Sequence, residues 1–182
     1  MNTALLVMDI QKRIVNRVQD AGFLPRLGRA VDSARSADIP VLYVVVGLRA
    51  GHPEASPRNQ AFGALPPDSF TDNDPDAVIH PDLAPRPGET VITKKRVSAF
   101  TGSDLDVVLR AGNIEHLVLT GIATSGVVLS TLRQAADLDY RLTVLSDGCS
   151  DLDPEVHSVL TTKVFPRQAE VVTIDDWAKS LG

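Results

Sequence analysis

Residues 117–151 read LVLTGIATSGVVLSTLRQAADLDYRLTVLSDGCSD, and this stretch decides the fold class. Short apolar runs that do not alternate with polar residues occur at His116–Thr120, which overlaps its start, and at Leu142–Leu145. Such runs are typical of strands buried on both faces, as in a parallel sheet covered by helices. Between them, Val128, Leu132, Ala135 and Ala136 follow helical spacing. The stretch therefore predicts a strand–helix–strand unit with a right-handed crossover.

The same alternation of strand-like and helix-like segments extends along the whole chain. Further apolar runs occupy Ala4–Met8, Val41–Val46, Thr90–Ile92 and Glu170–Thr173. Helical stripes are formed by Leu24, Leu27, Val31 and Ala34, by Leu105, Val108 and Leu109, and by Val156, Val159, Leu160 and Val164. We predict an α/β fold, a three-layer α/β/α sandwich with a six-stranded, mainly parallel, Rossmann-like sheet. Residues 1–182 are expected to form a single domain.

The amino-acid composition and net charge limit which class of protein this is and which partners it can bind. The 182 residues are 43% hydrophobic and 23% charged, with a net charge of −5 and both signs spread along the chain. Nucleic acid is not expected as a partner, because phosphate binding needs a basic face. No apolar run approaches the ~18 residues of a membrane span. With one cysteine, an internal disulfide is impossible. These features predict a cytoplasmic protein that binds a small molecule.

One long segment, Gly47–Pro87, interrupts the alternation and holds most of the 12 prolines. Connections of this length in compact domains tend to be functional or disordered. It is either a surface excursion or a lid or inter-subunit arm, and we favour the second because the segment follows a strand whose carboxyl end faces the ligand crevice. Its apolar residues predict a homodimer or larger homo-oligomer, and they are Leu48, Ala61, Phe62, Leu65 and Phe70.

Polar residues that could carry chemistry follow two of the predicted strands. Asp9 comes directly after the first strand and Lys94 ends the third. Ligands bind beyond the carboxyl ends of parallel strands, so both residues are candidate site residues. The alternatives are that Asp9 caps a turn and that Lys94 belongs to a solvated basic loop. A helix that opens near Ser125 would offer free N–H groups to an anion, although ordinary strand–helix packing also explains that turn.

Taken together and in order, these segments resemble the isochorismatase-like hydrolase superfamily, which includes isochorismatases, nicotinamidases and several amidases. The matching positions are Asp9 and Gln11 after the first strand, Lys94, Ser98 and Phe100 in KKRVSAF, Gly121 and Thr124 in the turn before the helix, and Asp147 at the end of the next strand. The resemblance implies that Asp9 is an acid or base and that Lys94 stabilises charge. It also implies that Gln11, Ser98, Phe100, Ala123 and Thr124 shape the substrate pocket, and that the Ile122–Ala123 peptide bond is cis.

The sequence departs from the superfamily at Val127. Most members have a nucleophilic cysteine there, which completes a Cys–Asp–Lys triad. Isochorismatases proper also lack that cysteine, and they cleave a vinyl ether with the aspartate as proton donor. The resemblance therefore implies a hydrolase that uses Asp9 and Lys94 without a cysteine nucleophile. Two alternatives stay open: a catalytically silent binding or assembly protein of the same fold, and an amidase that uses Cys149 or a water molecule.

Neither a metal nor a cofactor is expected from the sequence. The four histidines have no close ligand spacing. The Asp-x-His element of nicotinamidases is missing, which argues against that activity. No glycine-rich phosphate or dinucleotide loop is present. The sequence does not determine the pKa of Asp9, because burial raises the pKa of a carboxyl group and a neighbouring lysine lowers it.

Overall fold

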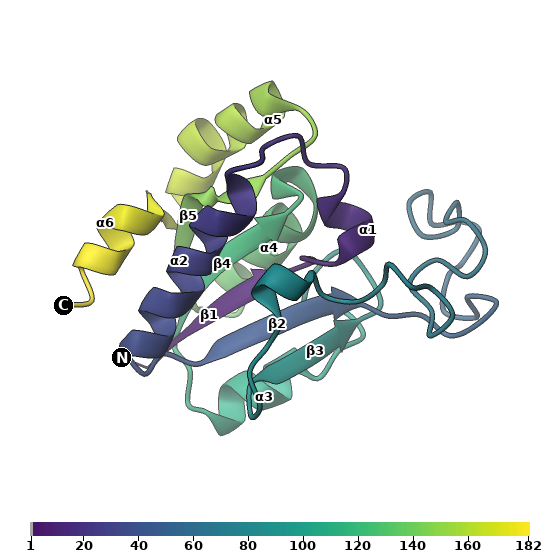
Figure 1. The fold of residues 1–182 in the computed structure, drawn as a ribbon, viewed down its shortest axis with the longest axis horizontal. Helices are drawn as coiled ribbons and strands as arrows, with labels where there is room; N and C mark the ends of the chain where they lie inside the picture. Colours follow the sequence, from purple (N-terminus) through teal and green to yellow (C-terminus); the bar gives the residue numbers. More distant parts are fainter. Residues whose placement is uncertain (1) are drawn as a thin grey trace.

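The computed structural model describes residues 2–182 and contains one six-stranded parallel sheet. The strands are β1 (Thr3–Met8), β2 (Val41–Val46), β3 (Thr90–Lys94), β4 (His116–Ile122), β5 (Arg141–Ser150) and β6 (Glu170–Val172). Their order across the sheet is β3-β2-β1-β4-β5-β6, and every adjacent pair is parallel (Figure 1). The predicted fold class is confirmed.

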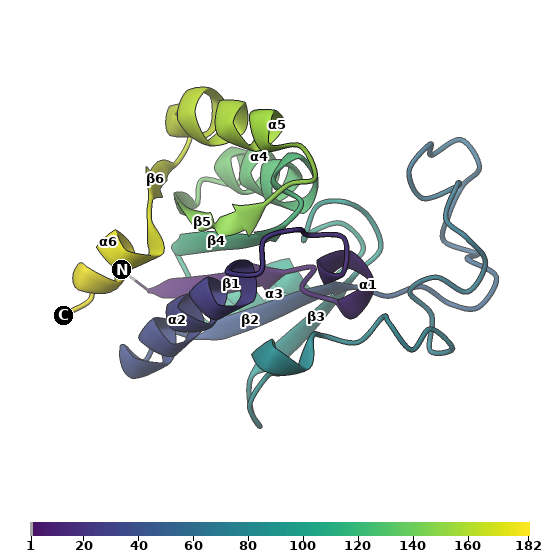
Figure 2. The same cartoon turned by 45° about the horizontal axis from the view of Figure 1, so that its top comes forward.

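Helices cover both faces of the sheet. They are α1 (Lys12–Val15), α2 (Phe23–Ser36), α3 (Leu105–Ala111), α4 (Leu129–Asp137), α5 (Pro154–Val159) and α6 (Ile174–Lys179). Single turns occur at η1 (Pro81–Leu83), η2 (Thr124–Val128), η3 (Leu160–Val164) and η4 (Phe165–Arg167), of which η2 and η3 are π-type. Figure 2 shows α4 and α5 above the sheet and α2 on the opposite side.

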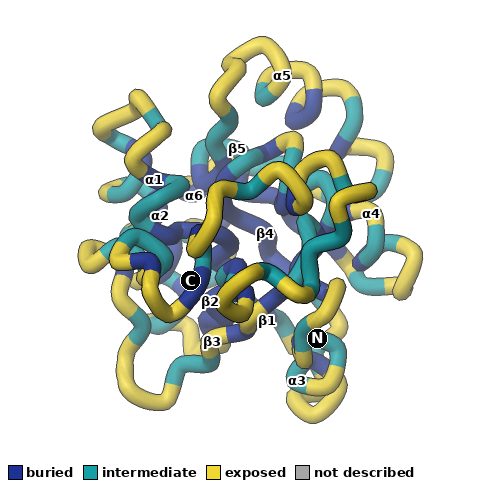
Figure 3. Tube along the Cα trace, turned by 90° about the vertical axis from the view of Figure 1, so that its right-hand side faces the viewer, coloured by how far each residue is buried: buried dark blue, intermediate teal, exposed yellow. Residues whose placement is uncertain are grey.

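The central strands are buried on both faces, which explains their uninterrupted apolar sequences. Along β1, Leu6 and Met8 pack on the side of α3 and α4, whereas Leu5 and Val7 pack on the side of α2 and α6. Burial is concentrated in these strands, and the outer surfaces of the helices are exposed (Figure 3). The two apolar cores fix the register of the sheet, because a shift by one residue would exchange the two faces.

Two details of the predicted elements are wrong. Val156 and Val159 are 36% and 41% exposed, because α5 turns into the π-type η3 and only Leu160 of that stripe is buried. The fifth strand continues beyond Leu145 to Ser150, so Asp147 lies within β5 and not at its end. A register shift against β4 accompanies this extension. Asp147 Oδ1 accepts a hydrogen bond from the backbone N–H of Ile174, which ties β5 to α6 (2.8 Å).

The long segment Gly47–Pro87 extends beyond the carboxyl ends of β1, β2 and β3 (Figure 1). Part of its apolar character is packed within the chain: Leu48 and Phe62 are buried against Val46 at the end of β2, whereas Ala61 is exposed. Its second half returns to the sheet, where Ile79 forms an antiparallel bridge with Gln11. This packing within the chain removes part of the argument for an exposed apolar interface, and the predicted homo-oligomer stays a prediction.

Candidate active site

Asp9 lies directly after β1, at the carboxyl edge of the central strand. Its backbone N–H donates to Val44 O of the neighbouring strand (2.8 Å). Its φ of 59° is uncommon for a residue with a side chain, although aspartate tolerates it better than most. Backbone conformations of this kind cluster at functional sites. The side chain is buried, with the residue only 6% exposed.

Lys94 ends β3 and reaches across the end of β2 to Asp9. Its Nζ lies 3.1 Å from Asp9 Oδ2 and also donates to Arg96 O (2.9 Å). At 1% exposure, Lys94 is among the largest fully buried side chains of the chain. A buried ammonium is stable only when it is paired and hydrogen-bonded, and both conditions hold here. The structure therefore brings together the two residues that sequence position singled out.

Burial has a larger effect on the pKa of Asp9 than the neighbouring Lys94 has. Desolvation raises the pKa of Asp9 to about 6, and the charge and hydrogen bond of Lys94 only partly oppose that rise. Within the described chain, Asp9 Oδ1 is buried and has no hydrogen-bond partner. Buried polar atoms normally have a hydrogen-bond partner. A bound ligand could therefore donate a hydrogen bond to this carboxyl oxygen beside the buried lysine. The pair can therefore exchange a proton close to neutral pH.

The end of β4 lies unusually close to β1. Gly121 has a φ of +143°, and a Cβ at this position would lie 2.3 Å from Met8 O. Only glycine allows this approach, which places the following turn beside Asp9. The next peptide bond, Ile122–Ala123, is cis, as the resemblance implied.

The turn after β4 is held by residues from α5 and the loop before it. Thr124 Oγ1 shares a hydrogen bond with His157 Nδ1 (2.8 Å), and the Ser125 N–H donates to Asp151 Oδ2 (2.7 Å). The predicted N–H donors at the start of this helix therefore do not include Ser125, because a carboxylate of the same chain occupies its N–H. Sequence reasoning missed Asp151 and His157, since both partners lie in a distant segment without a motif.

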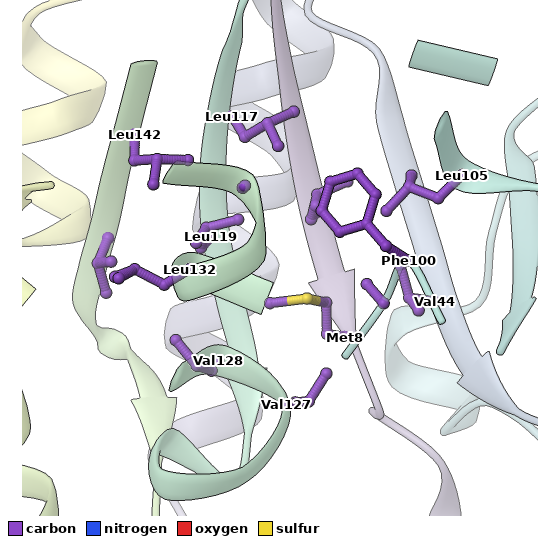
Figure 4. Packing of buried hydrophobic residues seen from close by; sticks show 14 of the residues in the cluster. Met8, Val44, Phe100, Leu105, Leu117, Leu119, Val127, Val128, Leu132 and Leu142 are labelled. Atoms are coloured by element: carbon purple, nitrogen blue, oxygen red, sulfur yellow. The ribbon is translucent and has the colours of Figure 1, made fainter. Parts of the chain in front are cut away.

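Val127 is buried at 2% exposure and belongs to the core on the α3–α4 side. Figure 4 shows it near Met8, with Val128 on the same turn and Phe100 farther along the core. Its side chain is aliphatic and packs with other apolar groups. Phe100, predicted to shape the pocket, is likewise a core residue, with its ring 6.2 Å from that of Tyr140.

Two other predicted pocket residues hold the backbone around the site. The Gln11 amide donates to Val46 O (2.9 Å) and Ala77 O (2.6 Å) and accepts from Val46 N (2.9 Å). It therefore ties the end of β2 to the returning half of the long segment. Ser98 Oγ donates to Gln134 Oε1 of α4 (2.7 Å). Contact of either residue with a substrate stays a prediction.

Cys149 is the chain's single cysteine and lies within β5. It is 4% exposed, and its Sγ is 3.9 Å from Leu119 O. Burial raises the pKa of the thiol to about 12. The nucleophilic form of cysteine is the thiolate, so a thiol in these surroundings is inert near neutral pH.

Metal-binding clusters and membrane-spanning helices are both absent from residues 2–182. No group of three or more His, Cys, Asp or Glu side chains in this range is arranged to hold a metal ion. In the same range, no helix combines the length and apolar character that crossing a membrane requires.

Comparisons with known proteins place the chain in one family. The isochorismatase domain model matches residues 3–176. The uncharacterized isochorismatase family protein YwoC of Bacillus subtilis is 30% identical over 184 residues, which cover 98% of this chain and 94% of YwoC. The ureidoacrylate amidohydrolase RutB of Stutzerimonas stutzeri is 32% identical over 210 residues, covering 98% and 79%. A solved isochorismatase family protein from Burkholderia thailandensis superimposes with a TM-score of 0.86 at 32% identity, covering 99% and 95%. The chain therefore belongs to the isochorismatase family of hydrolases.

Proposed function

We propose that this hydrolase cleaves a vinyl-ether or related C–O bond of a small molecule by acid–base chemistry, with Asp9 as proton donor, Lys94 as its neighbouring cation and no cysteine nucleophile. The observation that carries the proposal is the buried Asp9–Lys94 pair at the carboxyl edge of the sheet, with a carboxyl pKa of about 6. Carboxyl groups that act as acids near neutral pH have their pKa raised by burial in this way.

The proposed reaction starts with transfer of the Asp9 proton to the terminal carbon of the vinyl ether. The electron pair of the C=C bond forms the new C–H bond, and the ether oxygen shares the resulting positive charge. Water then adds to the cationic carbon, and its proton returns to Asp9. Collapse of the hemiketal breaks the C–O bond and releases an alcohol and a ketone. The Lys94 ammonium, 3.1 Å from Oδ2, stabilises the carboxylate that exists between the two proton transfers.

The test is a hydrolysis screen over isochorismate, small primary amides and carbamoyl compounds. Each compound is incubated with the wild-type chain and with the Asp9→Asn variant. Turnover of a vinyl ether that requires Asp9 supports the proposal. Absence of turnover for every compound would instead favour a silent binding or assembly protein, a role with which the closed surroundings of Asp9 and Lys94 are compatible.

A second candidate function is amide hydrolysis by an activated water molecule. The observation in its favour is the similarity to ureidoacrylate amidohydrolases, which are about a third identical to this chain. In that reaction Asp9 would act as a base and remove a proton from the attacking water. Turnover of a carbamoyl compound but not of a vinyl ether in the same screen would select this candidate.

The pH dependence of the reaction is expected to separate the two roles of Asp9. Because its pKa is raised to about 6, an acid role predicts that kcat/KM is highest below that pH. The value should then fall in proportion to the protonated fraction as the pH rises. A base role predicts the opposite slope. Initial rates measured from pH 4.5 to 8.5 check this, and a profile without an inflection near pH 6 would exclude Asp9 from both roles.

Thiol reagents are expected to leave activity unchanged. Cys149 is buried, its pKa is raised to about 12, and it is the only cysteine. Iodoacetamide should label it slowly in the folded protein and completely in urea, as mass spectrometry can measure. A Cys149→Ser variant serves as the control for reagent effects elsewhere. Rapid inactivation of the wild type, with protection by substrate, would revive the alternative in which Cys149 is the nucleophile.

The proposed function extends to the domain, the partner and the assembly of the chain. We infer that residues 1–182 act as one isochorismatase-like domain whose partner is the small-molecule substrate. A homodimeric or larger assembly, a cytoplasmic location and operation without a cofactor stay predictions. Light scattering at micromolar concentration tests the first, and a monomeric mass would contradict it.

A further inference from the structure

Arg96 contributes the second contact that holds the Lys94 ammonium. Lys94 Nζ donates to the backbone oxygen of Arg96 at 2.9 Å and faces Asp9 Oδ2 at 3.1 Å. The two acceptors together fix where the ammonium lies. The backbone around Arg96 belongs to the turn after β3, which has no sheet partner of its own. Lys95 provides part of the support for this turn, because its N–H donates to Thr101 O (3.1 Å) and its Nζ donates to Gly47 O (2.5 Å).

The Arg96 side chain adds to this support by binding the Gly47–Pro87 segment. Its guanidinium donates to Glu54 O (2.6 Å) and to the adjacent Lys95 O (2.6 Å). It also lies over the Phe62 ring, with Cζ 5.5 Å from the ring centroid. A planar guanidinium can donate in two directions and stack on an aromatic face at the same time, which a lysine cannot reproduce.

The part of the long segment that Arg96 binds is itself anchored beside the site. Phe62 is 7% exposed and packs with Val46 and Leu48. Val46 is the residue of β2 that lies opposite Lys94 in the sheet register, and Gln11 bonds both its N–H and its carbonyl. The segment, the end of β2 and the turn after β3 thus form one connected network around the Asp9–Lys94 pair.

We infer that Arg96 is a positioning residue whose side chain docks the Gly47–Pro87 segment and whose carbonyl holds Lys94 against Asp9. The inference rests on the proposed function of the Asp9–Lys94 pair. It assigns the long segment a definite task, which is to fix the turn that orients the lysine. Among charged groups, Lys94 is the one whose contacts shift the pKa of Asp9, so the titration of Asp9 reports the position of Lys94.

The experiment compares Arg96→Met, Arg96→Lys and the control Arg49→Met. Arg49 lies in the same long segment and pairs with the Glu54 side chain, but its side chain is 73% exposed and forms no hydrogen bond or ion pair with the turn after β3 within the described residues. The carboxyl ¹³C resonance of Asp9, identified by its loss in Asp9→Asn, is titrated in each folded protein. The kcat and KM values are measured on the substrate from the screen.

In Arg96→Met we expect the turn to relax and Lys94 to move away from Asp9. The Asp9 carboxyl should then titrate at a higher pH than in the wild type. At pH 5, where Asp9 is protonated in both proteins, the kcat value should fall by up to about 10²-fold, the loss that follows from misplacing a catalytic group by about 1 Å. KM should stay near its wild-type value. Arg96→Lys keeps the charge but not the several N–H donors of the guanidinium, so its Asp9 titration and kcat should lie between those of the wild type and Arg96→Met. Arg49→Met should match the wild type in both measurements.

Two results would overturn the inference. An unchanged Asp9 titration in Arg96→Met would show that the arginine does not hold the lysine. A rise in KM with an unchanged kcat would make Arg96 a substrate-binding residue instead. Should Arg96→Met not fold, Arg96→Lys and Phe62→Leu carry the same comparison, because both loosen the docking and keep most of the packing. The ¹³C titration needs no substrate, so it decides the inference even if the proposed hydrolysis fails.

Discussion

Replacing Asp9 by asparagine is expected to lower kcat/KM about 10²–10⁴-fold, the usual contribution of a general acid or base. The amide keeps the size and shape of the carboxyl group but carries no transferable acid proton. Asparagine also tolerates the left-handed backbone conformation of this position, where φ is 59°. Steady-state kinetics on the compound identified by the screen measures the loss.

Asp139→Asn is the matched control for this substitution. Asp139 has nearly the same backbone conformation as Asp9, with a φ of 65°, but it lies exposed in the turn before β5. Its replacement should leave kcat/KM unchanged, so a loss confined to Asp9→Asn is assigned to the proton. Full activity of Asp9→Asn on the true substrate would show that Asp9 is not the acid or the base.

Much of the fold could be predicted because the buried strands carry a local signal. The runs at Ala4–Met8 and Val41–Val46 are apolar on both faces of the sheet, a pattern that is typical of strands in a covered parallel sheet. The extension of β5 to Ser150 could not be predicted, since Ser146, Asp147 and Gly148 are polar or small. The extension pairs with β4 only after a register shift, through Cys149 and Ser150, and their partners Gly121 and Ile122 are distant in the sequence.

The part of the site that lies at the ends of strands could be predicted from the sequence. Asp9 and Lys94 each follow a predicted strand, and parallel strands bring their carboxyl ends to one edge. The partners of the turn after β4 gave no such signal. Asp151, which accepts from the Ser125 N–H, and His157, which bonds Thr124, become neighbours only through the packing of α5. The pKa of Asp9 needed the structure as well, because it depends on how completely the carboxyl group is buried.

The second large effect is expected on stability, when Lys94 is replaced by methionine. Methionine keeps the length of the apolar stem but removes the charge, which leaves the Asp9 carboxylate buried without its partner. Removing one member of a buried ion pair costs about 3–5 kcal/mol in the free energy of unfolding. Urea unfolding at pH 8 measures the loss. Lys179→Met, at a side chain that is 79% exposed, is the control and should change stability by less than about 0.5 kcal/mol.

The loss in Lys94→Met should depend on pH with a definite sign. Even in the wild type, the pKa of Asp9 is raised from 3.8 to about 6 on folding, so stability from this group is present at low pH and is lost as the pH rises through the folded-state value. Without Lys94, which lowers that pKa, the folded-state pKa of Asp9 rises further and the loss of stability extends toward pH 8.

The stability of Lys94→Met should therefore be closer to that of the wild type at pH 5, where Asp9 is protonated. Adding Asp9→Asn should recover stability at pH 8, because no unpaired charge is then buried. Equal deficits at pH 5 and pH 8, or no recovery in the double variant, would mean that the cost comes from lost packing and not from the charge of Asp9.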